Sequence, residues 1–229
     1  MDRVPRTIDR ELKSTRRDLG WGVYELGDLR AYLAFSGATQ DAHQALPWLR
    51  TILLPVRHTP HLADYSFSDL ISLFVVRELL KKGVWPRTIR DAEVYLRRKW
   101  KTDRPFVKDE IKTDGRAVFV DDEVVAGGQI ESADRRGQQV MREVISDRLT
   151  RVQYNEGSAA YWTPTKGVLV DPRVQFGEPV VEGTRVPTEA VAELAGSMGV
   201  DGAALQLGVS QSDALLAIAF EKRLAELRA

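Results

Sequence analysis

The chain of 229 residues contains no cysteine, which excludes disulfides, thiolate nucleophiles and cysteine metal ligands and suits a reducing cytoplasm. Its three histidines are His43, His58 and His61, and no two of them have the spacing of a helical zinc motif. No apolar run approaches about 18 residues, and no charged-then-apolar segment opens the chain. We therefore expect a cytoplasmic globular protein with no membrane span, signal peptide, metal or cofactor.

The chain also lacks net charge, but its charge is unevenly placed. Residues 1–112 hold 21 lysines and arginines against 15 aspartates and glutamates, a net of +6. Residues 113–229 hold 12 against 18, a net of −6. A basic half joined to an acidic half is typical of a nucleic-acid-binding module fused to a second unit, although solubility alone also produces such an asymmetry.

Two short helices are predicted in the basic half. Apolar spacing predicts one over 26–35, closed by Gly37, and a second that begins at Ala38 and is limited by Pro47 to about three turns. This pair is a helix-turn-helix candidate, and the basic loop after it is a candidate wing. The side chains predicted to contact DNA are Thr39, Gln40, His43, Gln44, Arg50, Arg57 and His58. The alternative is a pair of packed helices with no DNA contact.

A stronger helix pair follows over residues 65–100. Ser66 and Asp69 resemble a capping box, and Gly83 stands where the first of these helices should end. Pro86 suits the first position of the second helix. That helix carries a run of arginines and lysines, which is more often a solvated face than a phosphate-binding surface.

These features together resemble a MerR-type winged helix-turn-helix over about residues 20–100. The resemblance rests on Tyr24-x-Leu-Gly-Asp-Leu-Arg, Trp48, the proline-rich loop and "YSFSDLISLFVVRELLKKGVWPRTIRDA". It implies a unit that binds double-stranded operator DNA. Because operators are commonly two-fold, we also expect a homodimer.

The connecting segment is predicted to be mixed. Alternating apolar residues predict a β-hairpin around Asp121-Asp122, with Val118, Val120 and Val124 buried. Residues 140–149 predict a short amphipathic helix, and "KGVLVDPRV" predicts a strand that ends at Asp171-Pro172. Tyr161 and Trp162 are expected to pack in the interior rather than stack on a base.

The loop "FGEPVVEGTRVPTEAV" contains glycines but lacks the spacing of a phosphate-binding loop. Five residues separate Gly177 from Gly183, and no lysine follows the second glycine. We interpret the loop as a rigid connector in which glycines permit positive φ and prolines restrict φ. Its structural residues are Gly177, Pro179, Gly183, Thr184, Arg185 and Pro187. Thr188 is expected to cap a helix that opens with Glu189.

Three helices are predicted after this loop. The third begins after a Ser210 cap, with Asp213 three residues later, and has no lysine or arginine before Lys222. A duplex carries one negative charge per about 1.7 Å, so such a helix gains little from binding DNA. We expect it to pack in the core or against a partner protein.

Residues 165–227 closely resemble the bacterial domain of unknown function 433, found in VapB-like antitoxins. The shared signature is a strand ending in Asp-Pro, then Gly-x-Pro-Val-Val, Gly-Thr-Arg-Val-Pro and a trihelical unit. The resemblance implies an antitoxin that represses its own operon and neutralises a PIN-type ribonuclease toxin by direct contact.

A cation placed among the metal-binding carboxylates of such a ribonuclease would inhibit it directly. The last turns of the chain offer cations beside apolar residues, so we predict partner contacts by Phe220, Lys222, Arg223, Leu227 and Arg228. The alternative is a solvated helix end whose cations suit the helix dipole.

The predicted fold class is mainly α with a small β-hairpin region: a winged helix-turn-helix followed by a trihelical unit. We divide the chain into an N-terminal arm (1–19), a DNA-binding domain (20–112), a hairpin and connecting segment (113–164) and an antitoxin-type domain (165–229). Two other functions compete. One is a MerR-like transcriptional regulator whose C-terminal domain dimerises or senses a ligand.

The other is an enzyme that uses Arg185 with Glu178, Glu182 and Asp171. We expect no enzyme, because carboxylates beside an arginine more often stabilise turns and no nucleophile accompanies them.

Overall fold

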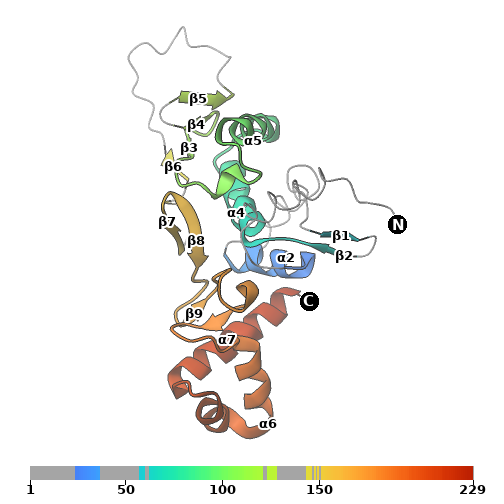
Figure 1. Cartoon of the computed structure of the whole chain (residues 1–229), viewed down its shortest axis with the longest axis vertical. Coiled ribbons are helices and arrows are strands. Elements are labelled where there is room, and N and C mark those ends of the chain that lie inside the picture. The colour runs from blue at the N-terminus through green and yellow to red at the C-terminus, as the bar shows by residue number, and fades with distance from the viewer. Residues whose placement is uncertain are drawn as a thin grey trace, which may run out of the picture.

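The computed structural model describes residues 24–36, 57–59, 62–120, 123–127, 143–145, 147, 149 and 151–228. In this part of the chain the fold is mainly helical with small antiparallel sheets, as predicted. The elements stack along the long axis of the molecule (Figure 1). A four-stranded sheet and α5 (Pro86–Trp100) lie at one end, and α6 (Thr188–Leu207) and α7 (Gln211–Arg228) lie at the other.

The predicted winged unit begins with α2 (Leu26–Phe35). The strands β1 (Arg57–Thr59) and β2 (Leu62–Asp64) form an antiparallel hairpin directly before α4 (Phe67–Lys81). The backbones of Tyr24 and Tyr65 pair as an isolated bridge, which ties the chain before α2 to the chain after β2. The hairpin therefore occupies the place in the chain order where a wing was predicted.

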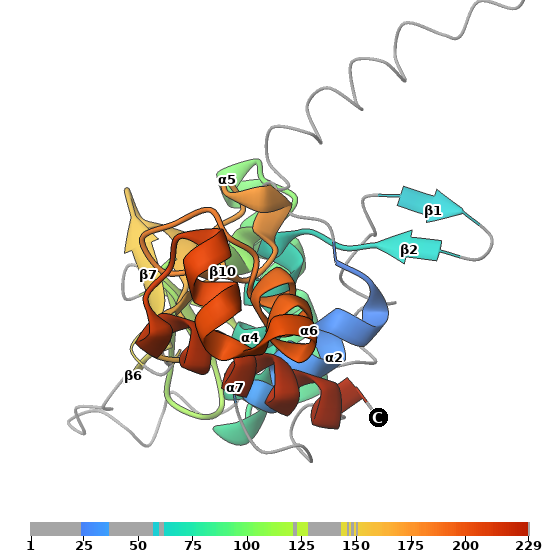
Figure 2. The ribbon, with the colours of Figure 1, turned by 90° about the horizontal axis from the view of Figure 1, so that it is seen from below.

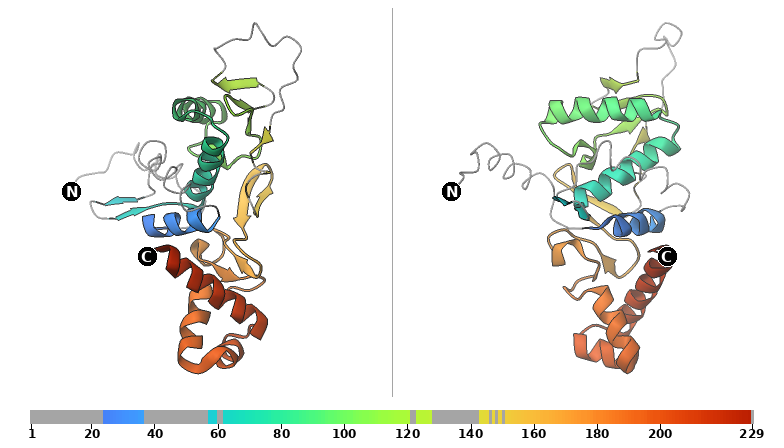
Figure 3. Two further views of the ribbon diagram at one scale, coloured as in Figure 1. Left: turned by 180° about the vertical axis from the view of Figure 1, so that it is seen from behind. Right: turned by 90° about the vertical axis from the view of Figure 1, so that its right-hand side faces the viewer.

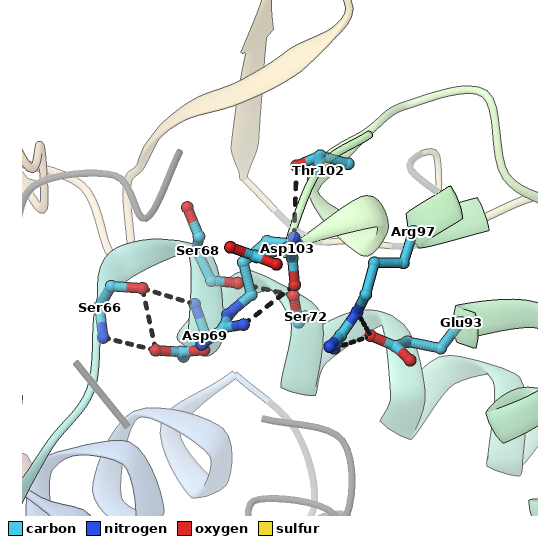
Figure 4. A network of polar contacts seen from close by, with 9 residues as sticks. Ser66, Ser68, Asp69, Ser72, Glu93, Arg97, Thr102 and Asp103 are labelled. Carbon is cyan, nitrogen blue, oxygen red and sulfur yellow. Dashed lines mark hydrogen bonds and ion pairs between the residues drawn. The ribbon is translucent and has the colours of Figure 1, made fainter. Parts of the chain in front are cut away.

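Helix α4 forms for the local reasons visible in the sequence. The Asp69 amide donates to Ser66 Oγ at 3.2 Å, and the Ser66 amide donates to Asp69 Oδ2 at 2.8 Å (Figure 4). Pro86 is the first residue of α5, as expected. α4 is buried along most of its length, and its Arg77 guanidinium donates to the Leu33 carbonyl at 3.0 Å. That cation joins α4 to the C-terminal end of α2, where the helix dipole favours positive charge.

The four-stranded sheet has the order β5-β4-β3-β6. Its strands are β3 (Lys112–Thr113), β4 (Val118–Val120), β5 (Glu123–Ala126) and β6 (Glu143–Val144), and a 3₁₀ turn, η2 (Pro105–Val107), precedes it. Two predictions fail here. Val124 is 46% exposed, because the register pairs it with Phe119 while Val118 and Val120 point to the buried face. Residues 143–144 form a strand rather than a helix, because they complete the ladder of β3.

A second hairpin leads to the C-terminal unit. It consists of β7 (Val152–Asn155) and β8 (Ser158–Trp162), and a bridge from Trp162 to Val170 links it to β9 (Val168–Leu169). Strand β9 pairs with β10 (Val180–Val181) across a loop that contains a 3₁₀ turn, η4 (Gln175–Gly177). Trp162 is 1% exposed and meets the rings of Tyr32 and Phe74 edge-on, so it packs as predicted.

The three predicted C-terminal helices are present. Gly199, with φ 81° and ψ 166°, interrupts α6, so the segments before and after it act as two helices. The Asp213 amide donates to Ser210 Oγ at 3.1 Å, which confirms the predicted cap of α7. The prediction for Thr188 is wrong. It is the first residue of α6, and its hydroxyl bonds to the Pro179 carbonyl and the Glu221 carboxylate instead of capping the helix.

Helix α7 packs against α2, although the two are far apart in the sequence. The rings of Phe35 and Phe220 lie 5.0 Å apart, and the Arg228 guanidinium lies 2.8 Å from Asp28 Oδ1. Both views in Figure 3 place the C-terminal end of α7 beside α2. Phe220 and Leu224 belong to the core formed by α2 and α4, whereas a smaller apolar cluster holds α6 to the first half of α7.

Within the described residues, no helix is both long enough and apolar enough to cross a membrane.

Candidate functional site

The predicted wing extends away from the body of the molecule. Figure 2 shows β1 and β2 projecting past α2. Arg57 pairs in register with Asp64, and His58 pairs with Ala63. The other residues predicted to contact DNA lie outside the described part of the chain; they are Thr39, Gln40, His43, Gln44 and Arg50.

The loop before α6 is held in shape by its own hydrogen bonds. Gly177 and Gly183 have φ of 85° and 78°, as the connector interpretation requires. The Thr184 hydroxyl donates to the Val181 carbonyl at 2.8 Å and accepts from the Val186 amide at 3.0 Å.

The two prolines of this loop are held through backbone contacts. The Pro179 carbonyl accepts the Thr188 amide at 2.9 Å, and Pro187 forms a bridge with Val180. Strands β9 and β10 and the start of α6 are thereby fixed together.

Asp171 and Arg185, two of the charged residues considered for an enzyme, do not pair with each other. Asp171 pairs with Arg173 at 2.7 Å rather than with Arg185, whose side chain is exposed and whose carbonyl accepts from Gln175 Nε2. Burial alone would raise the pKa of Asp171, but the hydrogen bonds and charge of Arg173 outweigh it and lower that pKa. This pair stabilises the turn after β9.

The predicted partner-binding residues of α7 divide into two groups. Phe220 is 2% exposed, Leu227 packs against the same core, and Arg228 pairs with Asp28. Phe220 therefore does not present an apolar anchor to a partner, because α2 covers it. Lys222 and Arg223 are exposed, and Arg223 Nη1 lies 2.9 Å from Glu226 Oε2.

A cavity of about 530 Å³ lies where the start of α2, the loop before α6, and α7 meet. Its lining is acidic and partly aromatic. It consists of Tyr24, Glu25, Gly27, Asp28, Tyr32, Glu178, Pro179, Pro187, Thr188, Glu189, Glu221, Leu224 and Arg228. This size falls within the range of small-molecule sites, about 300–1,000 Å³.

The two tyrosines of the cavity differ in their hydrogen bonding. The Tyr24 hydroxyl donates to the Gly177 carbonyl at 2.9 Å. The Tyr32 hydroxyl makes no hydrogen bond with a described residue, although the side chain is 98% buried, its relative exposure being 2%. Burial raises the pKa of Tyr32, and the nearby charges of Asp28, Glu221 and Glu178 raise it further against the opposing effect of Arg228.

Glu221 is a partly buried carboxylate of the cavity. Burial raises its pKa, and the Thr188 hydroxyl and Arg228 offset only part of that increase. The single proton of the Thr188 hydroxyl serves either Glu221 or the Pro179 carbonyl at 3.2 Å, so Glu221 is incompletely compensated.

Most of this cavity was not predicted from the sequence. Among its acidic residues only Glu178 and Glu189 were singled out, the first as part of a different cluster and the second as the start of a helix. The others come from α2 and α7, which are separated by nearly the whole chain: Asp28 and Arg228 are 200 positions apart. No short-range pattern signals such a site, because helical periodicity reports which face of a helix is apolar and not which helix it meets.

Comparison with known proteins bears on the fold. No protein-family model matches this chain, and no curated protein is significantly similar to it. A solved structure, described as the X-ray crystal structure of Rv2018 from Mycobacterium tuberculosis, is similar to it with a TM-score of 0.55 and 17% sequence identity. The match covers 85% of this chain and 96% of that chain. At this identity, the likeness shows a shared fold.

Proposed function

We propose that this protein is a cytoplasmic antitoxin of a type II toxin–antitoxin pair. It acts as a homodimer that binds operator DNA through its N-terminal unit and neutralises a PIN-type ribonuclease through its C-terminal unit. The DNA-binding part is supported by one observation, the β1–β2 hairpin, which lies between α2 and α4 in the chain and extends from the body of the molecule. A wing in this position contacts the DNA backbone.

The toxin-binding part is supported by the C-terminal unit. Its order is a strand, β9, followed closely by Asp171-Pro172, then a constrained loop and three helices, and the antitoxin-type signature has the same order. The exposed Lys222 and Arg223 supply cations on α7, and Leu215, 53% exposed, adds apolar surface on the same helix. Cations on a rigid helix suit the carboxylates of a metal-dependent ribonuclease.

Operator binding is tested by three substitutions in the proposed reading surface. Arg57→Ala should weaken binding to all sequences and reduce the salt slope by about one phosphate contact. Gln40→Ala and Gln44→Ala should instead relax sequence preference. Arg116→Ala, at an exposed turn far from the wing, is the matched control. Unchanged footprints and salt slopes in all three variants would reject the assignment.

Toxin neutralisation is tested by charge reversal rather than truncation, because removing the end of α7 would also remove Leu224, which is 1% exposed. The double change Lys222→Glu with Arg223→Glu should release ribonuclease activity from the co-purified complex while operator binding persists. The matched control reverses two exposed cations at the other end of the molecule, Lys101→Glu with Arg116→Glu. Full silencing by the α7 variant would show that inhibition uses another surface.

A second candidate function is a transcriptional regulator that senses a ligand. The cavity between α2 and α7 favours it, since a ligand there would contact both the DNA-binding unit and the C-terminal unit. Co-purification with the product of the adjacent gene distinguishes the two functions. A stable complex that silences a ribonuclease supports the antitoxin, and operator binding with no such partner supports the regulator.

A further inference from the structure

We propose that the cavity between α2, the loop before α6, and α7 binds an organic cation through an ammonium or guanidinium group. This inference does not depend on the proposed antitoxin function, because it rests on the lining of the cavity alone. A ligand there would lie at the junction of the two ends of the chain.

The first argument is the charge of the lining. Five carboxylates face one cation: Arg228 stands against Glu25, Asp28, Glu178, Glu189 and Glu221. Two helix N-termini also line the cavity, and their partial positive charge accounts for Glu25, Asp28 and Glu189, which lie beside or within first turns. Glu178 lies in the loop and Glu221 lies in the middle of α7, so neither has such a role.

The second argument is independent of charge. The Tyr32 side chain is only 2% exposed and lines the cavity, and its hydroxyl makes no hydrogen bond with a described residue. Polar groups at the end of a buried side chain are nearly always hydrogen-bonded, so a hydroxyl that opens onto a cavity is available to a ligand there. An N–H of a bound cation can donate to the Tyr32 oxygen while its charge is balanced by Glu178 and Glu221.

The spacing of the carboxylates favours an organic cation of some length. They come from α2, the loop, the start of α6, and α7, and no group of three or more acidic or histidine side chains among the described residues is close enough to hold one metal ion. A cavity of about 530 Å³ also exceeds what a single ion fills. An extended amine or a guanidinium on an alkyl chain fits both features.

The same chemical group can come from two sources, a free polyamine or the side chain of a basic peptide. We would titrate the full chain calorimetrically at low salt with spermidine and, separately, with a short capped peptide carrying a single arginine. Inorganic phosphate serves as the opposite-charge probe, because helix N-termini attract anions. Saturable binding of one equivalent of spermidine or of the arginine peptide is expected, and the stronger of the two identifies the source.

The variants are chosen to separate the cavity from general surface charge. Glu178→Gln with Glu221→Gln should weaken binding at least about tenfold, the loss expected when a charge-assisted hydrogen bond is removed. Tyr32→Phe, which keeps the ring, should weaken it about fivefold or more. Glu193→Gln removes the same charge from an exposed position of α6 outside the cavity, and its affinity should match the wild type.

Circular dichroism melts establish that each variant is folded, and Tyr32→Phe keeps the test decisive should the double variant unfold. The proposal is overturned if neither cation binds the wild type saturably, if Tyr32→Phe and the double variant bind as tightly as the control, or if only phosphate saturates the site.

Discussion

At the scale of single residues, Arg104 has no sequence feature that marks it as structural, yet it is 2% exposed. Its guanidinium pairs with Asp69, which is fully buried and also completes the capping box of α4 with Ser66. One carboxylate therefore serves two purposes, and Figure 4 shows Asp69 within this network at the start of α4. Breaking a buried ion pair is costly because it leaves the remaining charge without compensation.

We predict that Arg104→Ala lowers the free energy of unfolding by about 3–5 kcal/mol, because Asp69 is then a buried charge without its partner. Urea denaturation followed by circular dichroism measures this loss. Arg87→Ala is the control: its side chain is 91% exposed and lies 3.9 Å from Asp91, so a change within about 0.5 kcal/mol is expected. Equal effects of the two substitutions would show that the Arg104 pair contributes no more than a surface contact.

At the scale of elements, the shape of α6 depends on one glycine. Gly196 and Gly199 are three positions apart, and a Cβ added at either would meet no atom within 4 Å. Gly196 lies in regular helix, whereas Gly199 adopts a backbone conformation that is essentially confined to glycine. Packing is thus equal at the two positions, and only the backbone differs.

The same substitution should therefore have opposite effects at these two sites. Gly196→Ala should raise the free energy of unfolding by about 0.5–1 kcal/mol, because alanine loses less conformational entropy in a helix. Gly199→Ala should lower it by roughly 1–3 kcal/mol, the cost of a strained backbone. Chemical denaturation of the two variants gives both values. Changes of the same sign would mean that the interruption of α6 does not require glycine.

At the scale of the whole molecule, the packing of α7 on α2 joins the two ends of the described chain. Phe220 and Leu224 lie in the core that also contains α2 and α4. The rings of Phe35 and Phe220 meet at a tilt of 56°. If these contacts hold the two ends together as one cooperative unit, a substitution in α7 must change the stability contributed by α2.

A double-mutant cycle measures this coupling. Phe35→Leu and Phe220→Leu should show an interaction free energy of about 0.5–1.5 kcal/mol, as expected for an aromatic pair in contact. Unfolding followed by tryptophan fluorescence should remain a single transition. Phe106→Leu paired with Phe220→Leu provides the control: Phe106 is buried in η2, which packs mainly against α4 and α5, so those two effects should add. A coupling near zero for Phe35 and Phe220 would contradict a direct contact between the two rings.

Local features could be predicted from the sequence because they depend on residues within about four positions of each other. The Ser66 and Ser210 caps, the start of α5 at Pro86 and the positive φ of Gly177 and Gly183 are of this kind. The mainly helical fold with small hairpins follows from the same short-range rules, together with the length of each apolar pattern.

Most of the failed predictions involve a partner distant in sequence. Residues 143–144 became a strand because the edge of β3 was available. Val124, by contrast, is exposed for a local reason, because it pairs with Phe119 on the face opposite Val118 and Val120. Phe220, expected on the surface, is buried by α2.

The cavity depends on tertiary structure in the same way. Its carboxylates acquire a shared role only when α2 and α7 meet. The sequence by itself determined the helices, caps and turns, because hydrogen bonds and torsional preferences act over a few residues. Only the tertiary structure decided which charged and apolar faces meet, because burial is a property of surfaces brought together from the two ends of the chain.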